Sequence, residues 1–210
     1  MNFNLQHFLI GFAALIINIT VHEFGHAIAA VRAGDDTPKL QGRVSLNPID
    51  HLDPMGTILM IFTSLTGVGF GWGKPVIVNP LNFKNPRWDN LRVSFQGPLH
   101  NLILAAVAGT IIRFTPGMTS SPVAMFLDSL ALTGIFLALF NLIPLGPLDG
   151  SHILSSLLPV ETARKYDRIN GQYGAIAMLV LIFMGRGILS FILGIPGALL
   201  YMLFTGRTFF

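Results

Sequence analysis

The sequence contains no cysteine, and only 11% of its 210 residues are charged. The absence of cysteine excludes disulfide bonds and thiolate metal sites, so any bound metal ion must use nitrogen and oxygen ligands. An ordinary soluble domain has about 25% charged residues, so this chain has too few to cover a surface that faces water. Runs of basic residues of the kind that bind nucleic acid are also missing, and no nucleic-acid partner is expected.

The rest of the composition is strongly apolar: 52% of the residues are hydrophobic, and the mean hydropathy is +0.65. This composition predicts an all-α polytopic membrane protein, and the length allows about five or six membrane segments of about 20 residues each. The first six residues contain no Lys or Arg, and the apolar run continues past Ile19 without a small-residue cleavage site. We therefore expect a first membrane helix rather than a cleaved signal peptide.

Long apolar stretches organise the chain into one domain over residues 1–210. Three of them, at about residues 5–31, 93–114 and 123–143, are each long enough to cross a bilayer. A fourth, at 173–204, is interrupted by "MGRG" and predicts two short spans or one hairpin. Residues 159–172 are polar and are interpreted as a charged, solvated loop.

Two short stretches between the first and second spans predict a small β element. "GRVSLNP" (42–48) alternates polar and apolar residues, and "KPVIVNP" (74–80) has a proline near each end. The residues between them, 55–70, are apolar but form only a short segment.

The positions of the basic residues predict that residues 55–70 turn back. Under the positive-inside rule, the three loops that carry Lys and Arg lie in the cytoplasm. Their basic residues are Arg32, Lys39 and Arg43, then Lys74, Lys84, Arg87 and Arg92, and finally Arg164, Lys165 and Arg168. Because the loops on both sides of 55–70 are then cytoplasmic, this segment must enter and leave by the same side, as a re-entrant hairpin. The alternative is an ordinary short span.

The first apolar stretch contains "HEFGH", which places two imidazoles and a carboxylate within little more than one helical turn. Residues four apart share one face of a helix, so His22 and His26 can both present a nitrogen atom to one metal ion. Glu23 is near enough to act on a water molecule at that ion. Polar residues are costly inside a membrane and are usually functional there, so the pattern predicts a zinc site. The alternative is a polar cluster that bonds to neighbouring helices.

A zinc site that does chemistry usually has three protein ligands and one open position. Without cysteine, the third ligand must be His, Asp or Glu. Asp149 is the best candidate, because it follows the third span in the broken segment "NLIPLGPLDG", and unwound backbone at membrane depth often marks a binding site. The alternative makes "LDG" a turn or the start of a helix, with Asp149 as the N-cap.

Counting from basic residues at the inner face places two candidate residues at one depth. His22 lies ten residues before Arg32, about 15 Å along a helix, and Asn101 lies nine residues after Arg92, about 13.5 Å. Asn101 and Asn141 are expected either to bind an oxyanion or a substrate backbone, or to bond a neighbouring helix.

Five motifs occur in the order "HEFGH", "GRVSLNPIDHLDP", "GWGKPVIVNP", "GPLHN" and "NLIPLGPLDG". Together they make the chain resemble the site-2 protease family of intramembrane zinc metalloproteases, the M50 peptidases, over nearly its whole length. The resemblance implies one zinc ion bound by His22, His26 and Asp149, with Glu23 as the general base. It also implies that Asn101 and Asn141 hold the substrate strand or the oxyanion.

The resemblance further implies a substrate class and a place of action. The expected activity is zinc-dependent endopeptidase cleavage in or near the membrane helices of single-span protein substrates, with the predicted strands pairing to an unwound substrate. We expect a catalytic core at about 5–158 and C-terminal membrane segments at about 173–204, in the cell membrane, with the active site nearer the cytoplasmic face. No room is left for a PDZ or CBS domain of about 60 to 100 residues, so a minimal member of the family is expected.

The sequence leaves two alternative functions. A membrane metal transporter or metal sensor would also use intramembrane His and Asp, but it has no need for Glu beside the first His. A protease homologue without activity is the other alternative, and the intact ligand set with Glu23 argues against it. The roles of His51, His100 and His152 are open; His100 departs from the family, in which a small residue usually precedes the Asn.

Overall fold

The computed structural model describes residues 4–66, 71–115, 117 and 121–208. This part of the chain forms eight α-helices and two short 3-10 turns. The helices are α1 (Leu5–Ala33), α2 (Thr37–Leu40), α3 (Pro54–Thr66), α4 (Pro86–Phe114), α5 (Pro122–Asn141), α6 (Asp149–Leu157), α7 (Val160–Met184) and α8 (Arg186–Thr205); the turns are η1 (Pro48–His51) and η2 (Pro80–Asn82).

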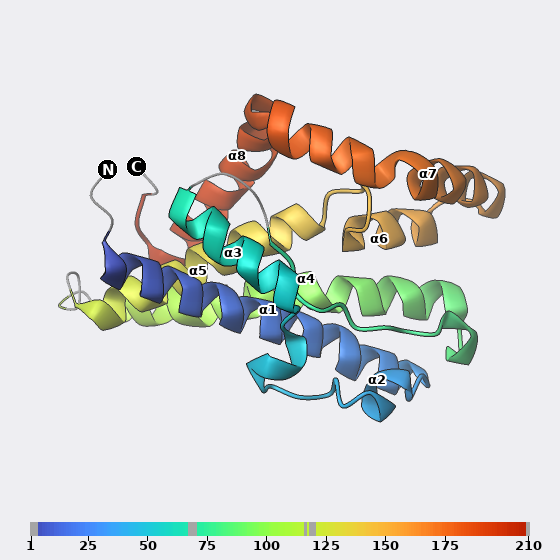
Figure 1. The fold of residues 1–210 in the computed structure, drawn as a ribbon, viewed down its shortest axis with the longest axis horizontal. Coiled ribbons are helices and arrows are strands. Elements are labelled where there is room, and N and C mark those ends of the chain that lie inside the picture. Colours follow the sequence, from blue (N-terminus) through green and yellow to red (C-terminus); the bar gives the residue numbers. More distant parts are fainter. Residues whose placement is uncertain (1–3, 67–70, 116, 118–120, 209–210) are drawn as a thin grey trace.

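Helices α1, α4 and α5 run side by side along the long axis of the molecule, and α8 packs against α4 and α5 (Figure 1). Their shared core contains many small side chains, which let helix backbones approach closely. The buried residues of this core are Ala14, Ala105, Ala108, Leu130, Ala131, Ile135 and Tyr201. Asn18 joins α1 to α5, because its Nδ2 donates a hydrogen bond to the carbonyl of Leu130 at 3.1 Å.

Four helices in the described part of the chain are long and apolar enough to cross a membrane: α1, α4, α5 and residues Gly187–Thr205 of α8. The first of these begins after Asn4, whose side chain accepts a hydrogen bond from the His7 N–H, and ends at Gly34, whose φ of 108° favours glycine. Its 29 residues extend about 43 Å, which exceeds the thickness of the hydrocarbon layer. The arrangement is that of a multi-pass membrane protein.

The expectation of five or six membrane segments is therefore wrong for the described residues. The polar stretch 160–172, for which the sequence predicts a loop, is the first half of helix α7. Glu161 and Arg164 pair at 3.1 Å on its exposed surface, and the side chains of Tyr166 and Asn170 bind the backbone around residues 144–146. Because half of α7 is polar, it is not one of the candidate spans.

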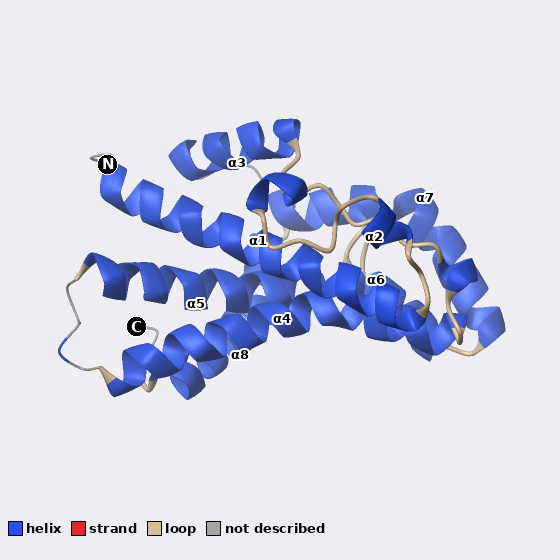
Figure 2. Ribbon diagram, turned by 90° about the horizontal axis from the view of Figure 1, so that it is seen from below, coloured by secondary structure: helices blue, strands red, loops and turns tan. Residues whose placement is uncertain are grey.

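The predicted small β element is also absent: among the described residues there are helices and loops but no β-strand (Figure 2). The segment 74–79 has no regular secondary structure, because side chains bind the backbone groups that a sheet would use. Arg43 donates to the Lys74 carbonyl, the Val76 N–H donates to Glu23, and the Asn79 N–H donates to Asp35. Hydrogen bonds to side chains thus replace the expected ladder.

Helix α3 has the length and the end points that a re-entrant segment requires. Its 13 residues extend about 20 Å, less than the roughly 30 Å of the hydrocarbon layer. Leu52, before the helix, and Gly73, after it, form an isolated antiparallel bridge, and the Lys74 N–H donates to the His51 carbonyl at 2.8 Å. The chain therefore leaves and returns at one place. Residues 67–70 of the predicted hairpin lie outside the described residues, and re-entry into the bilayer stays a prediction.

Candidate active site

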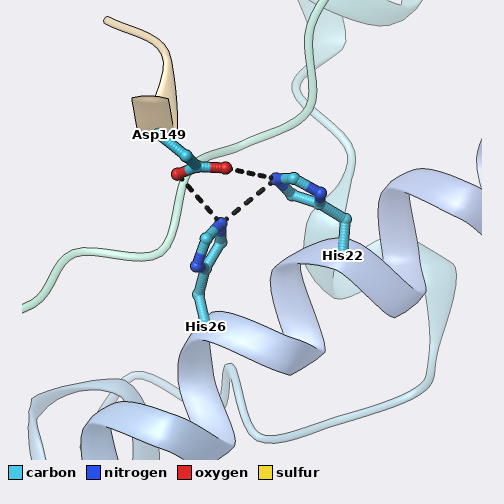
Figure 3. Close-up of side chains that lie close together, drawn as sticks. All are labelled: His22, His26 and Asp149. Carbon is cyan, nitrogen blue, oxygen red and sulfur yellow. Dashed lines mark hydrogen bonds and ion pairs between the residues drawn. The ribbon is translucent and has the colours of Figure 1, made fainter. Parts of the chain in front are cut away.

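Three side chains from two helices meet at one point (Figure 3). His22 and His26 project from the same face of α1, one turn apart, and Asp149 is the first residue of α6. The two Nε2 atoms are 3.1 Å apart, and they lie 3.1 Å and 3.2 Å from the two carboxylate oxygens of Asp149. The structure thus brings together the three residues that the sequence predicts as metal ligands.

The broken segment after α5 delivers Asp149 to this point. Gly146 has a φ of +61°, and Gly150 packs so tightly that a Cβ there would lie 2.3 Å from the Leu142 carbonyl oxygen. Asn170 of α7 fixes the turn, since it accepts from the Gly146 N–H at 2.9 Å and donates to the Gly146 carbonyl at 3.2 Å. Asp149 is the first residue of α6, but the N-cap is Leu148, so the alternative that Asp149 caps the helix is wrong. Its side chain faces the imidazoles instead.

Both imidazoles are oriented by contacts at their other ring nitrogen. Nδ1 of His26 lies 2.8 Å from the Val93 carbonyl oxygen, so it carries the proton and leaves the Nε2 lone pair free. Nδ1 of His22 lies 3.2 Å from the side-chain amide of Asn101. If Nε2 of His22 binds a metal ion, its Nδ1 is a donor and the Asn101 amide turns its oxygen toward it. That oxygen has no other hydrogen-bond partner among the described residues.

The donor set fits a zinc ion. Atoms bound to one zinc ion at about 2.0 Å in a tetrahedral arrangement are about 3.3 Å from one another. The two Nε2 atoms are 3.1 Å apart, and each has one oxygen of Asp149 nearby, Oδ2 at 3.1 Å for His22 and Oδ1 at 3.2 Å for His26. Oδ2 of Asp149 is buried and makes no hydrogen bond within the described part of the chain, although it lies near His22. A buried carboxylate oxygen that has no hydrogen bond and lies beside an imidazole nitrogen is the arrangement that a cation would stabilise.

The carboxylate of Glu23 is held beside this group by a backbone contact. Its Oε2 accepts a hydrogen bond of 2.9 Å from the Val76 N–H. Two residues earlier, the Lys74 carbonyl accepts from the guanidinium of Arg43, which also donates to the Asp50 carbonyl. Burial lowers the pKa of Arg43, and the carboxylates of Glu23 and Asp50 act in the opposite direction. The sequence does not reveal that Val76 and Arg43 support the site. Val76 acts through its backbone N–H and Arg43 binds backbone carbonyls, and contacts with the backbone leave no pattern in the residue types.

The two predicted asparagines occupy different places. Asn101 is fully buried against His22, whereas Asn141 lines a cavity of about 530 Å³ that His22 and Glu23 also line. Nδ2 of Asn141 donates to the Leu137 carbonyl of its own helix at 2.9 Å.

The other histidines lie away from the three candidate ligands. His100 bonds the Gln96 carbonyl through Nδ1 at 2.7 Å and packs edge-on against Phe24. His51 is fully buried and bonds the Ser45 carbonyl through Nε2, and His152 is exposed. None of the three is part of the described cluster of possible metal ligands.

Comparison with known proteins gives the family. The model of peptidase family M50 matches residues 10–122 and 106–185. The chain belongs to peptidase family M50. It is 42% identical over 174 residues to "Putative zinc metalloprotease YwhC" of Bacillus subtilis (strain 168), covering 80% of this chain and 77% of the relative. No solved structure was found to match the chain.

More distant relatives of this M50 peptidase carry similar names. "Putative zinc metalloprotease Rip2" of Mycobacterium tuberculosis (strain ATCC 25618 / H37Rv) is 34% identical over 180 residues, or 83% of this chain and 66% of the relative. "Zinc metalloprotease MJ0392" of Methanocaldococcus jannaschii is 26% identical over 182 residues, or 85% of this chain and 43% of the relative. These names agree with the donor set in indicating zinc, and they indicate a metalloprotease rather than a transporter.

Asp35 anchors the segment that holds Glu23. It is fully buried just beyond α1 and accepts four hydrogen bonds, from the Thr37 N–H and hydroxyl, the Asn79 N–H and the Asn82 side chain. Burial alone would raise the pKa of Asp35, but the bonds from Thr37, Asn79 and Asn82 outweigh it and hold the pKa below its ordinary value.

Replacing Asp35 by asparagine is expected to lower the free energy of unfolding by about 2 kcal/mol at neutral pH, because hydrogen bonds to a charged acceptor are lost. A lowered pKa means that the ionised carboxylate stabilises the fold above the unfolded-state value of about 4. This contribution disappears as the pH falls through the still lower pKa of the folded protein. Thermal unfolding of purified Asp35→Asn and parent across this pH range measures it, with Asp36→Asn at the exposed neighbouring position as the control. A difference that stays constant down to the lowest pH would contradict the assignment.

Proposed function

We propose that this M50 peptidase is a zinc-dependent intramembrane endopeptidase, which cleaves peptide bonds in or near the membrane helices of single-span protein substrates. One observation carries the proposal: His22, His26 and Asp149 meet beside Glu23 within an apolar helix bundle, at the edge of a cavity lined mainly by apolar side chains. A site for cleaving soluble substrates would have no reason to lie in the middle of such a helix.

The chain's own residues supply the proton transfers and the positioning. His22, His26 and Asp149 would hold the zinc ion, which supplies a Lewis acid for the peptide carbonyl and lowers the pKa of water. Glu23 accepts a proton from the attacking water and donates it to the nitrogen atom of the leaving amine. The Val76 N–H binds one oxygen of Glu23 and leaves the other to exchange that proton.

The asparagines take different parts in this proposal. Asn141, on the cavity wall, contacts the substrate backbone or the oxyanion. Asn101 orients the imidazole of His22, because it is buried behind that ring. Its predicted contact with substrate stays a prediction.

We place the protein in the cell membrane, and the positions of the basic residues favour an orientation with the active site nearer the cytoplasm. Arg32 lies in the last turn of α1, and the metal group lies about 15 Å before it along the helix. Substrates that span the bilayer once can reach a site at this depth after local unwinding.

The test is cleavage of a single-span substrate by purified protein in liposomes. Glu23→Gln is expected to lower the cleavage rate at least about 100-fold, because the proton acceptor is lost, while the zinc content stays that of the parent. Glu161→Gln is the matched control, since Glu161 is exposed on α7 and pairs with Arg164. Equal cleavage by parent and Glu23→Gln would rule out this function.

A further inference from the structure

A cavity of about 530 Å³ adjoins Glu23 and His22 and is not accounted for by the chemistry of peptide hydrolysis. Its walls come from four helices that are far apart in sequence and from the loops around residues 71–75 and 147–148. They include Leu15 and Ile19 of α1, Leu137 and Phe140 of α5, and Met178 and Ile182 of α7, while Met60 of α3 closes a further side.

The cavity extends from the metal ligands in one direction only along α1. Leu15 precedes His22 by seven residues, about 10 Å along the helix, and lies on the side of the helix N-terminus. His26 does not line the cavity. His22, one of the three candidate ligands, and Glu23 therefore line one end of the cavity, and Leu15 lines the other end, within the apolar part of α1.

A peptide bound at the metal group must therefore meet two different environments. In the direction of the α1 N-terminus it enters the apolar cavity. In the opposite direction it runs toward the polar residues that follow α1. Every peptide substrate would therefore have an apolar environment on one side of the scissile bond and a polar environment on the other.

We propose that the cavity is a specificity subsite for a bulky apolar side chain, such as Leu, Met or Phe, on the side of the scissile bond that faces the N-terminal half of α1. The inference rests on the proposed endopeptidase function. The volume suffices, because an apolar cavity of about 150 Å³ already holds a benzene molecule. Polar or charged side chains are excluded, because the apolar walls offer them few partners.

The first arm of the test varies the substrate. The cleavage position in a single-span substrate is found by mass spectrometry, and the three residues on each side of the bond are changed in turn to Ala, Leu, Phe and Asp. On the side that enters the cavity, one position is expected to lose about 10-fold or more in cleavage efficiency from Leu to Ala, and more from Leu to Asp. The residues on the other side are expected to tolerate these changes.

The second arm changes the cavity. Ile182→Trp, which fills part of it, is expected to reverse the preference, so that the Ala substrate is cleaved better than the Phe substrate. Ile182→Ala, which enlarges it, is expected to improve cleavage of the Phe substrate relative to the Leu substrate. Val180→Trp is the matched control, because Val180 is two residues away on α7, half exposed and outside the cavity. Zinc content reports whether each variant is folded.

The outcomes separate this inference from the function on which it rests. Zinc-dependent cleavage that shows no preference at any position, or the same preference in the parent and both Ile182 variants, overturns the subsite and leaves the endopeptidase intact. A parent protein that cleaves no better than Glu23→Gln overturns both. A reversed preference in Ile182→Trp with an unchanged one in Val180→Trp supports the subsite.

Discussion

Replacing Gly97 by alanine is expected to lower the affinity for zinc about 100-fold, although the substitution adds a single methyl group. Gly97 lies on α4 where this helix crosses the ligand-bearing face of α1. A Cβ at this position would lie 2.4 Å from Nε2 of His26, 2.6 Å from its Cε1 and 2.7 Å from Cε1 of His22. Either the imidazoles turn away or the two helices separate, and a small loss of ligand orientation already costs about 10- to 100-fold in metal affinity.

Gly11→Ala is the matched control for this substitution. Gly11 is on α1, and a Cβ there would meet nothing within 4 Å, so alanine in the helix is expected to leave zinc binding unchanged. Competition titration with a chelator compares the two variants with the parent. Zinc affinity in Gly97→Ala equal to that of the parent would contradict the expectation that close packing at Gly97 holds the two imidazoles in place for zinc.

Changing Asp149 to asparagine is expected to empty the zinc site and to abolish cleavage. Asparagine keeps the shape of the side chain and one carbonyl oxygen, but it removes the only negative charge among the three ligands. The loss in affinity is expected to exceed about 100-fold, the upper end of the loss caused by removing a residue that only orients a ligand. Zinc per protein after purification, and cleavage after zinc is added back, measure the two effects.

Asp167→Asn controls for the loss of one carboxylate near the same helices. Asp167 is exposed on α7 and accepts a hydrogen bond from Ser155 of α6. This variant is expected to keep both zinc and activity. Full zinc content in Asp149→Asn would remove Asp149 from the ligand set and leave the site with two imidazoles.

The parts of the site that depend on helix geometry were predictable from the sequence. Four-residue spacing puts His22 and His26 on one face because an α-helix has 3.6 residues per turn. The depth count places Asn101 level with His22, and the structure has the two side chains in contact at 3.2 Å. The sequence indicates Asp149 because proline and glycine break the helix before it, and the same break lets the chain turn back.

The features of the fold that the sequence does not predict depend on contacts that residue types do not reveal. Alternation and flanking prolines are shared by strands and by segments such as 74–79, whose hydrogen bonds go to the side chains of Arg43, Glu23 and Asp35. Only the tertiary structure decides whether the backbone of such a segment bonds to a neighbouring strand or to side chains.

The sequence predicts a loop for the polar half of α7 for a related reason. Hydropathy marks a helix that faces lipid, but here the polar residues Tyr166 and Asn170 bind the turn that positions Asp149. These two hydrogen bonds depend on the position of the turn at Gly146, which the sequence does not predict.

The most direct test of the zinc centre is X-ray diffraction from zinc-loaded crystals of Glu23→Gln, collected at the zinc absorption edge. The structure predicts one strong anomalous peak, about 2.0–2.2 Å from Nε2 of His22, Nε2 of His26 and a carboxylate oxygen of Asp149. A peak at another place in the fold, or no peak in fully zinc-loaded crystals, would contradict it.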